Sequence, residues 1–249
     1  MSEQTFPILV GHRGWPARFP ENTLEGFAAA VSAGARWLEC DVQLSADGVP
    51  FVCHDVSLER TAGLDRKIPD MPAADLAAVT VGERQRFGEC HAHVRLPRLD
   101  ALIAWLVTQP RVTLFVEIKS ESLRHHGTEL VVDKVMQDIR IALAQCSVIS
   151  FDHACLTITR SLGARSIGWA VECATDENIA VANALKPDYL FTHEKIFTEM
   201  RTAFPGPWQW VPYHTEDAGR AMELARQDAS LVETNDIGAM LRAPQFAST

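Results

Sequence analysis

Residues 37–55 read WLECDVQLSADGVPFVCHD, and the rest of the chain is organised around this stretch. Glu39 and Asp41 lie two residues apart in an apolar run. Because side chains on a strand alternate between its two faces, both carboxylates project from the same face. Neighbouring carboxylates repel each other, and a cation that prefers oxygen ligands, such as Mg2+ or Ca2+, cancels that repulsion. The stretch therefore predicts a strand that carries part of a metal site.

The second half of the same stretch predicts a hairpin. Residues 45–48, Ser-Ala-Asp-Gly, form a turn signal, and residues 50–53 are apolar again. Pairing back from the turn places residues 53 and 54 roughly opposite 41 and 40, so that His54 arrives beside the carboxylates. This hairpin would hold both a candidate metal site and a candidate proton carrier. The alternative is a half-exposed edge hairpin whose charges are only solvated.

The chain before this stretch predicts a strand, a loop and a helix. Residues 8–10 are apolar and run into Gly-His-Arg-Gly at 11–14, the pattern of a buried strand that enters a loop. Apolar residues then recur at helical spacing over 24–31, with Asn22 as the expected N-cap and Glu25 completing a capping box. The histidine and arginine of the loop therefore lie at the exit of the first strand.

Charged residues follow another strand further along the chain. Residues 112–118 are largely apolar and contain Glu117, and Lys119 comes directly after them. Because side chains alternate between the two faces of a strand, Glu117 and Lys119 project from the same face. Strand-like stretches then recur about every twenty residues, with helical stretches between them, including 130–143 and 218–226.

The strand count predicts an α/β fold, the (β/α)8 or TIM barrel. The expected strands are centred near residues 9, 39, 115, 149, 168, 190, 210 and 231. Parallel strand–helix repetition over 249 residues closes most naturally into such a barrel. Residues 50–53 are too close to the second strand for a parallel crossover and are accessory. We expect one domain over residues 1–249, with a small insertion after the second barrel strand at approximately 56–97.

In a TIM barrel the active site lies at the C-terminal ends of the strands. The candidate residues fall at these ends: His12, Arg13, Glu39, Asp41, Glu117 and Lys119. Three convergent carboxylates need a counter-ion, so their coincidence favours a site over separate surface roles. The loops after the last two strands lack the glycine-rich cradle that many barrels use for phosphate. We expect the metal, Arg13 and Lys119 to hold any phosphate.

Composition narrows the class of partner. The net charge is −9 at pH 7 without a cluster of Lys and Arg, which argues against nucleic acid or an anionic membrane as a partner. The first ten residues lack the features of a secretory signal, and no apolar run reaches transmembrane length, so we expect a cytoplasmic protein without membrane insertion. The six cysteines show no CxxC spacing and are expected to be reduced core thiols. His91 and His93 are expected at the surface.

The motifs together resemble those of the glycerophosphodiester phosphodiesterases. The matching motifs, in family order, are His12-Arg13-Gly14, Glu21-Asn22-Thr23, Glu39-x-Asp41, Asp47-Gly48, His54-Asp55, Leu58-x-Arg60-Thr61, Leu96-Pro97-x-Leu99 and Glu117-Ile118-Lys119. In the second half, Ser150-Phe151 and Trp210 are similar to family landmarks. Asn235 stands where an Asp is common, and Tyr213 departs from the usual Trp-Thr-Val-Asn run. We expect these departures to affect substrate fit more than the reaction.

The resemblance implies a TIM barrel, one divalent cation, Mg2+ or Ca2+, and three sets of site residues. They are the metal ligands Glu39, Asp41 and Glu117, the catalytic histidines His12 and His54, and the substrate-binding residues Arg13, Lys119 and Trp210. In this arrangement Trp210 would wall the glycerol or alcohol side of the substrate.

The predicted reaction is hydrolysis of a small-molecule glycerophosphodiester to sn-glycerol 3-phosphate and an alcohol, with paired histidines moving protons. We expect attack by the glycerol 2-hydroxyl, which forms a cyclic 1,2-phosphate that water then opens. The alternatives are a phospholipase D-like enzyme on lysophospholipids or sphingolipids, a noncatalytic barrel that binds phosphate ligands, and an enolase-like lyase. The sequence leaves open the choice of Mg2+ or Ca2+, the preferred alcohol, the oligomeric state, and which histidine acts first as base.

Overall fold

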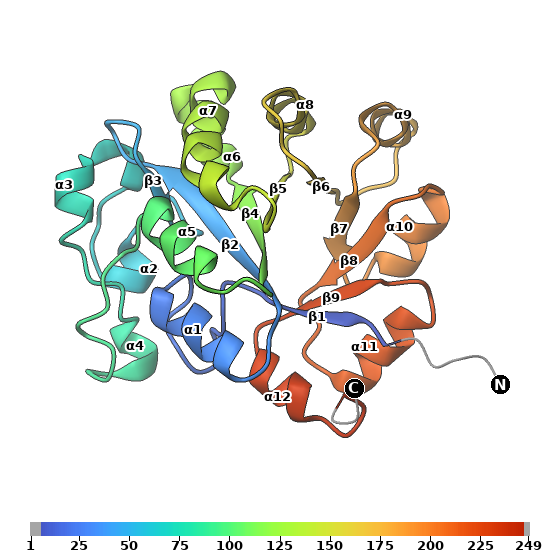
Figure 1. Ribbon diagram of the computed structural model, residues 1–249, viewed down its shortest axis with the longest axis horizontal. Helices are drawn as coiled ribbons and strands as arrows, with labels where there is room; N and C mark the ends of the chain where they lie inside the picture. The colour runs from blue at the N-terminus through green and yellow to red at the C-terminus, as the bar shows by residue number, and fades with distance from the viewer. Residues whose placement is uncertain (1–5, 247–249) are drawn as a thin grey trace.

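The computed structural model describes residues 6–246, and its centre is a curved sheet of parallel strands (Figure 1). The strand order is β8-β7-β6-β5-β4-β2-β1-β9, with all neighbours on this path parallel. These strands are β1 (Ile8–Gly11), β2 (Trp37–Leu44), β4 (Thr113–Ile118), β5 (Cys146–Ser150), β6 (Ile167–Ala170), β7 (Tyr189–His193), β8 (Gln209–Tyr213) and β9 (Leu231–Thr234).

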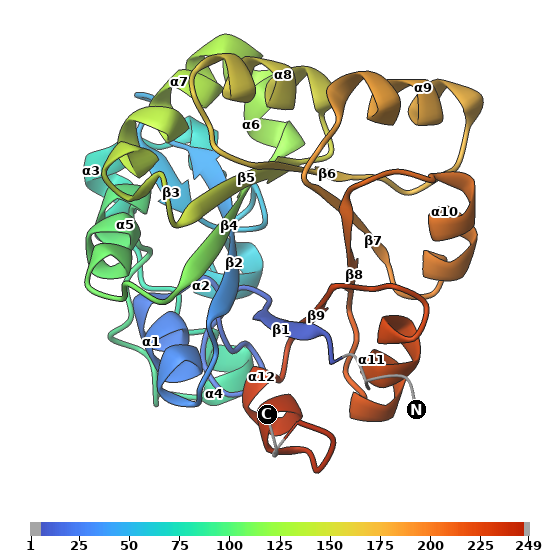
Figure 2. The same cartoon turned by 45° about the vertical axis from the view of Figure 1, so that its right-hand side comes forward.

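Helices follow the strands and lie on the outer side of the sheet in both views (Figure 1 and Figure 2). They are α1 (Leu24–Ser32), α5 (Leu99–Val107), α6 (Ser120–His126), α7 (Thr128–Ile139), the short η2 (Arg140–Ala142), α8 (His153–Ser161), α9 (Asp176–Leu185), α10 (Phe197–Ala203), α11 (Ala218–Ala225) and α12 (Ile237–Arg242). A bridge from Trp210 to Ala229 joins the last two strands and nearly closes the barrel. The TIM barrel predicted from the sequence is confirmed.

The hairpin after β2 has the predicted register. Strand β3 (Pro50–Val52) runs antiparallel to β2 and pairs Val52 with Val42. The backbone N–H of Cys53 donates to the carbonyl of Asp41 at 2.9 Å, so the chain delivers His54 beside the carboxylates.

An irregular segment with short helices follows the hairpin, and it lies to one side of the barrel (Figure 1). Its elements are α2 (Glu59–Ala62), η1 (Ile68–Asp70), α3 (Ala73–Leu76) and α4 (Arg84–Phe87). Side chains of this segment pack with Phe51 and Cys53 into a small apolar cluster of their own. The insertion therefore has a local core and places its residues beside the strand ends.

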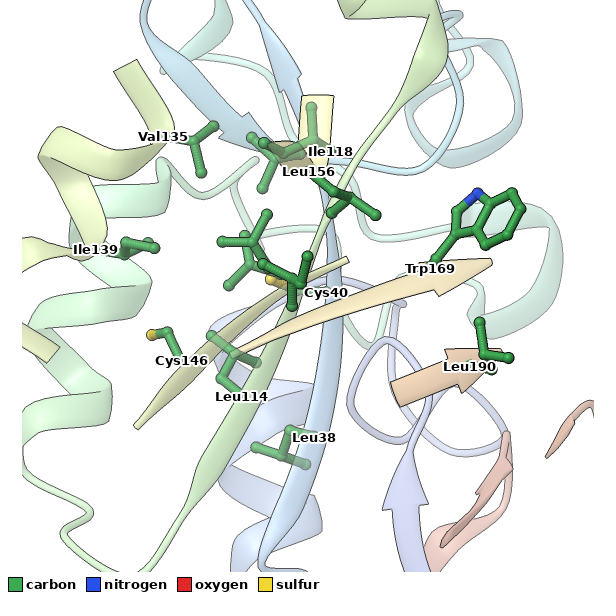
Figure 3. Close-up of a cluster of buried hydrophobic side chains, with 14 of the residues drawn as sticks. Leu38, Cys40, Leu114, Ile118, Val135, Ile139, Cys146, Leu156, Trp169 and Leu190 are labelled. Carbon is green, nitrogen blue, oxygen red and sulfur yellow. The ribbon is translucent and has the colours of Figure 1, made fainter. Parts of the chain in front are cut away.

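Two apolar layers explain why the acidic side chains lie where they do. The outer layer packs strands against helices and includes Leu38 and Cys40 of β2 (Figure 3). Residues that alternate with this layer point into the barrel, whose lower part is filled by apolar side chains such as Phe115 and Leu231. Glu39 and Asp41 alternate with Leu38 and Cys40, so they point inward above this apolar filling.

All six cysteines are free, but only four of them are buried. Cys90 and Cys173 are exposed, so the expectation of core thiols is wrong for these two. Both lie in loops at the surface rather than in the strands or helices that form the core. Over residues 6–246, no helix combines the length and apolar character needed to cross a membrane.

Candidate active site

Three carboxylates converge at the C-terminal ends of β2 and β4. The parallel register pairs Asp41 with Glu117, and Glu39 lies one inward position below Asp41. One oxygen from each of the three residues lies within 4.8 Å of the others. Glu39 and Asp41 are buried, whereas Glu117 is partly exposed and lines the cavities at the mouth of the barrel. The structure thus brings together the three residues that the sequence singled out as metal ligands.

The donor set fits a divalent cation. The Oε1 atom of Glu39 is buried and accepts no hydrogen bond from the residues that the structure describes. Burial, together with the charge of Asp41, raises the pKa of Glu39 well above its usual range. A buried carboxylate oxygen without a partner is costly, and a hard cation with oxygen ligands would remove that cost.

Two basic side chains flank the carboxylates. The Nζ atom of Lys119 lies 2.8 Å from Oε1 of Glu117 and 3.3 Å from Oδ1 of Asp41. Arg13 places its Nε 3.1 Å from Oδ2 of Asp41, and its backbone N–H donates to Oε2 of Glu39 at 3.0 Å. Burial alone would raise the pKa of Asp41, but Arg13 and Lys119 outweigh it and hold this pKa below its usual range.

Asn22 is a site residue whose role the sequence did not reveal. Its Nδ2 donates to Oδ2 of Asp41 at 2.8 Å, and its Oδ1 accepts from the backbone N–H of Asp41 at 3.2 Å. The predicted capping box is wrong, because the N-cap of α1 is Thr23, which accepts from the N–H of Gly26. Glu25 instead reaches His91 and His93. Asn22 has a φ of +57°, a left-handed conformation that Asn adopts more readily than most residues.

The tautomer of His12 follows from its neighbours. Oδ1 of Asn235 lies 2.8 Å from Nδ1 of His12, while Nδ2 of Asn235 donates to Oε1 of Glu216 at 2.7 Å. The carboxylate of Glu216 can only accept, which fixes the amide and turns its oxygen towards His12. Nδ1 of His12 therefore carries the proton, and Nε2 presents a lone pair 3.8 Å from Oε2 of Glu39. Burial lowers the pKa of His12 to about 3, so the ring is neutral at neutral pH.

His54 has a different partner behind its ring. Its Nδ1 lies 2.7 Å from Oδ1 of Asp55, and Oδ2 of Asp55 accepts from Nε of Arg60 at 2.6 Å. Arg60 also forms an ion pair with Glu21. Asp55 can therefore accept a charge-assisted hydrogen bond when the ring of His54 holds two protons. One candidate histidine is backed by an amide and the other by a carboxylate.

The two histidines and both basic residues line a cavity of about 300 Å3. The other lining residues are Glu117, Ile149, Phe151, Ala170, Glu172, Phe191, His193, Tyr213, His214 and Glu233. A wider cavity of about 900 Å3 continues from His54, Glu117 and Lys119 along the insertion. A bound molecule can therefore extend in two directions from the charged cluster.

The prediction that Trp210 walls the substrate is wrong. Its side chain is 5% exposed and belongs to the outer apolar layer, where its ring centroid lies 5.7 Å from that of Phe197. Alternation along β8 turns Val211 and Tyr213 towards the barrel interior instead. Tyr213, which the sequence marked only as a departure from the family pattern, lines the cavity.

Two further cavity residues were not found from the sequence. Glu233 points inward from β9 and is 4% exposed. Burial, with smaller contributions from Glu117 and Asp41, raises the pKa of Glu233 to about 8. His214 has a left-handed φ of +63°, and its ring centroid lies 5.3 Å from that of His12. A single acidic residue in a strand or a single loop histidine gives no spacing signal that would have identified it.

Comparisons with known proteins identify a family that this chain matches. Residues 12–185 match the model of the glycerophosphoryl diester phosphodiesterase family. The chain is 29% identical over 156 residues to the uncharacterized protein YqiK of Bacillus subtilis, covering 62% of each chain. It is 28% identical over 171 residues to a glycerophosphodiester phosphodiesterase of Caldanaerobacter subterraneus, covering 68% of this chain and 69% of that one. The chain thus spans less than two thirds of the first of these relatives.

Solved structures show the same fold. A phosphodiesterase of Oleispira antarctica, in complex with the product sn-glycerol-3-phosphate, matches with a TM-score of 0.83 and 22% identity, over 94% of this chain and 95% of that one. A glycerophosphodiester phosphodiesterase from Thermotoga maritima matches with a TM-score of 0.72 and 23% identity, over 95% and 97% of the two chains.

Proposed function

The chain belongs to the glycerophosphoryl diester phosphodiesterase family, and on this basis we propose that it hydrolyses glycerophosphodiesters to sn-glycerol 3-phosphate and an alcohol. The supporting observation is that three carboxylates, two histidines and two basic side chains meet at the mouth of one barrel. A site for binding alone would need the charges but not a pair of proton carriers on either side of them.

Glu39, Asp41 and Glu117 would hold one divalent cation, Mg2+ or Ca2+. Such a cation, when bound, supplies Lewis-acid polarisation of a phosphoryl oxygen. Arg13 and Lys119 already face the same cavity, and in the substrate complex they would bind the remaining phosphoryl oxygens and stabilise the negative charge that builds there.

The two histidines would act in a fixed order. The lone pair on Nε2 of His12 takes the proton of the glycerol 2-hydroxyl, and the freed oxygen attacks phosphorus. His54 gives a proton to the departing alcohol oxygen as its bond to phosphorus breaks, which leaves a cyclic 1,2-phosphate. A neighbouring nucleophile held in the same molecule can be worth about 7 to 11 kcal/mol of barrier. His54 then takes a proton from water as the water oxygen attacks phosphorus, and His12 returns its proton to the 2-oxygen as the bond from that oxygen to phosphorus breaks.

A panel of substrates separates the candidate functions. The purified protein would be assayed on glycerophosphocholine, glycerophosphoethanolamine, glycerophosphoglycerol and a lysophospholipid, with coupled detection of sn-glycerol 3-phosphate. We expect the first three to be hydrolysed. Turnover of the lysophospholipid alone would support the phospholipase D-like alternative. That alternative is less consistent with the wide cavity, whose lining is polar or charged except for Val56 and Phe151.

The cytoplasmic location expected from the sequence stays a prediction.

An analogue that lacks the 2-hydroxyl tests the order of steps. We expect 2-deoxyglycerophosphocholine to bind comparably but to turn over far more slowly, because the internal nucleophile is gone. The authentic cyclic 1,2-phosphate should be hydrolysed by the same protein, and His12→Gln should slow its hydrolysis. Rapid cleavage of the deoxy analogue would favour direct attack by water.

The amide behind His12 predicts a change in pH dependence. Nδ2 of Asn235 donates to Glu216, so Asn235→Asp is combined with Glu216→Gln, which keeps a donor opposite the new carboxylate. This double variant would place an ionised carboxylate beside the ring and raise the pKa of His12 by roughly 1 to 3 units. Because a base works only when it is unprotonated, kcat/KM falls as the pH drops through this pKa, and in the variant that fall should occur at higher pH. NMR titration of the His12 ring and the acid limb of kcat/KM should shift together. Asp236→Asn, one residue further on, is the matched control and should leave both unchanged.

A further inference from the structure

One buried carboxylate has no part in the proposed mechanism. Glu233 lies in β9 opposite Val10, one inward position above Leu231, so it sits directly over the apolar filling of the barrel. The side chain is 96% buried, and its Oε1 accepts no hydrogen bond from any residue in the range 6–246. A buried polar atom without a partner is costly and uncommon in folded proteins, so it needs a physical explanation.

The neighbouring charges do not provide that explanation. Glu233 lies outside the one set of acidic residues, among those that the structure describes, whose oxygens are close enough to share a cation. The basic residues of the site do not pair with Glu233 either, since Arg13 forms ion pairs with Glu21 and Asp41, and Lys119 with Asp41 and Glu117. A partner for Glu233 must therefore come from a molecule in the cavity.

The residues that line the cavity indicate which chemical groups this molecule has. Glu233 lines the cavity of about 300 Å3 together with His12, Phe191 and Tyr213. A carboxylate oxygen accepts hydrogen bonds, and the aromatic rings offer apolar surface to a short carbon chain. In the proposed reaction the phosphate lies at the basic residues and the 2-hydroxyl lies at His12. The glycerol unit has one more donor, its free primary hydroxyl.

We propose that Glu233 accepts a hydrogen bond from the free primary hydroxyl of the glycerol unit and so selects glycerol over alcohols that lack this group. This assignment rests on the proposed function. It makes Glu233 a specificity-determining residue, with the phosphate and the 2-hydroxyl placing the rest of the unit. A site built to bond a hydroxyl rejects the analogue without it, because its own acceptor is then left unpaired.

Two esters with the same leaving group test the proposal. Glycerophosphocholine is compared with the ester built on propane-1,2-diol, which keeps the 2-hydroxyl and lacks only the primary hydroxyl. We expect the parent protein to favour the glycerol ester in kcat/KM by about 10- to 100-fold, the usual cost of leaving a buried hydrogen-bonding group unpaired. In Glu233→Leu this ratio should collapse towards one, and Glu233→Gln, which keeps an accepting oxygen, should retain part of it.

The control is Glu172→Leu, which removes an exposed acidic residue from the same cavity and should keep the parent ratio. Equal losses on both esters in Glu233→Leu and Glu233→Gln, with the ratio unchanged, would overturn the proposal. If the parent protein hydrolyses neither ester, the proposed function fails. The role of Glu233 is then tested separately by measuring ligand binding with calorimetry in the presence of Ca2+. Tighter binding of sn-glycerol 3-phosphate than of propane-1,2-diol phosphate, lost in Glu233→Leu, supports the assignment. Equal affinities, or no binding of either, overturn it.

Discussion

Exhaustive chelation of divalent cations is expected to abolish hydrolysis of glycerophosphodiesters, and addition of Mg2+ or Ca2+ is expected to restore it. Without a cation, the substrate phosphate would have to approach Glu39, Asp41 and Glu117, which lie within 4.8 Å of one another. Like charges at this distance repel strongly when they are buried. Glu39→Gln removes one ligand charge and should produce the same loss in the presence of either cation.

Metal binding can be measured without activity. A ligand that binds only the folded state raises the apparent stability, so Ca2+ or Mg2+ should raise the Tm of the metal-free parent protein. Glu39→Gln should show little rise, whereas Glu172→Gln, at an exposed position in the same cavity, should respond like the parent. Activity that survives chelation, or a Glu39→Gln variant that binds metal as tightly as the parent, would show that the site is misassigned.

Replacement of either catalytic histidine should have the second large effect. His12→Gln and His54→Gln should each lower kcat by about 100- to 10,000-fold, the usual worth of a positioned general acid or base. His12 would lose the lone pair that faces the carboxylates, and His54 would lose the proton that its ring gives to the leaving alcohol. Because the two act in the same chemical step, the double variant should lose less than the product of the single losses.

A matched control separates this effect from a change in folding. His153→Gln replaces an exposed histidine of α8 outside the cavity and should keep kcat close to that of the parent. Circular dichroism and Tm should be similar for all three variants. A His12 or His54 variant with unchanged kcat and a weaker KM would make that histidine a binding residue instead.

The barrel could be predicted from the sequence because its strands are short apolar runs at regular spacing. The two-residue alternation in WLECDVQL was enough to separate Leu38 and Cys40, which face the helices, from Glu39 and Asp41, which face the interior. The turn at residues 45–48 fixed the hairpin register, and with it the position of His54. These are local features, and they can be recognised in the sequence without knowledge of tertiary contacts.

The roles of Trp210 and Asn22 could not be predicted from local sequence patterns. Strand β8 is buried on both faces, so its sequence, QWVPY, has no polar and apolar alternation to tell Trp210 from Tyr213. The role of Trp210 was implied by its similarity to a family landmark, and that similarity does not establish which of the two faces of the strand its side chain occupies. Asn22 depends on a contact with Asp41, 19 residues away, that no local pattern contains.

Asn235 shows how tertiary contacts change the meaning of a sequence difference. As a departure from the family pattern it was expected to affect substrate fit. Its side chain instead lies 2.8 Å from His12, where it sets the tautomer of the proposed base. The order in which the histidines act, which the sequence left open, is inferred from this contact and from the carboxylate of Asp55 behind His54.

The most direct measurement is a 31P NMR time course of the metal-loaded protein with glycerophosphocholine. The proposed reaction predicts that the diester signal is replaced by that of sn-glycerol 3-phosphate, with the cyclic 1,2-phosphate as an intermediate that builds up when its opening is slow. The signal of the cyclic compound should be absent with the 2-deoxy substrate. An unchanged diester signal, or conversion to phosphocholine through cleavage of the other ester bond, would contradict the assignment of this barrel as a glycerophosphodiester phosphodiesterase.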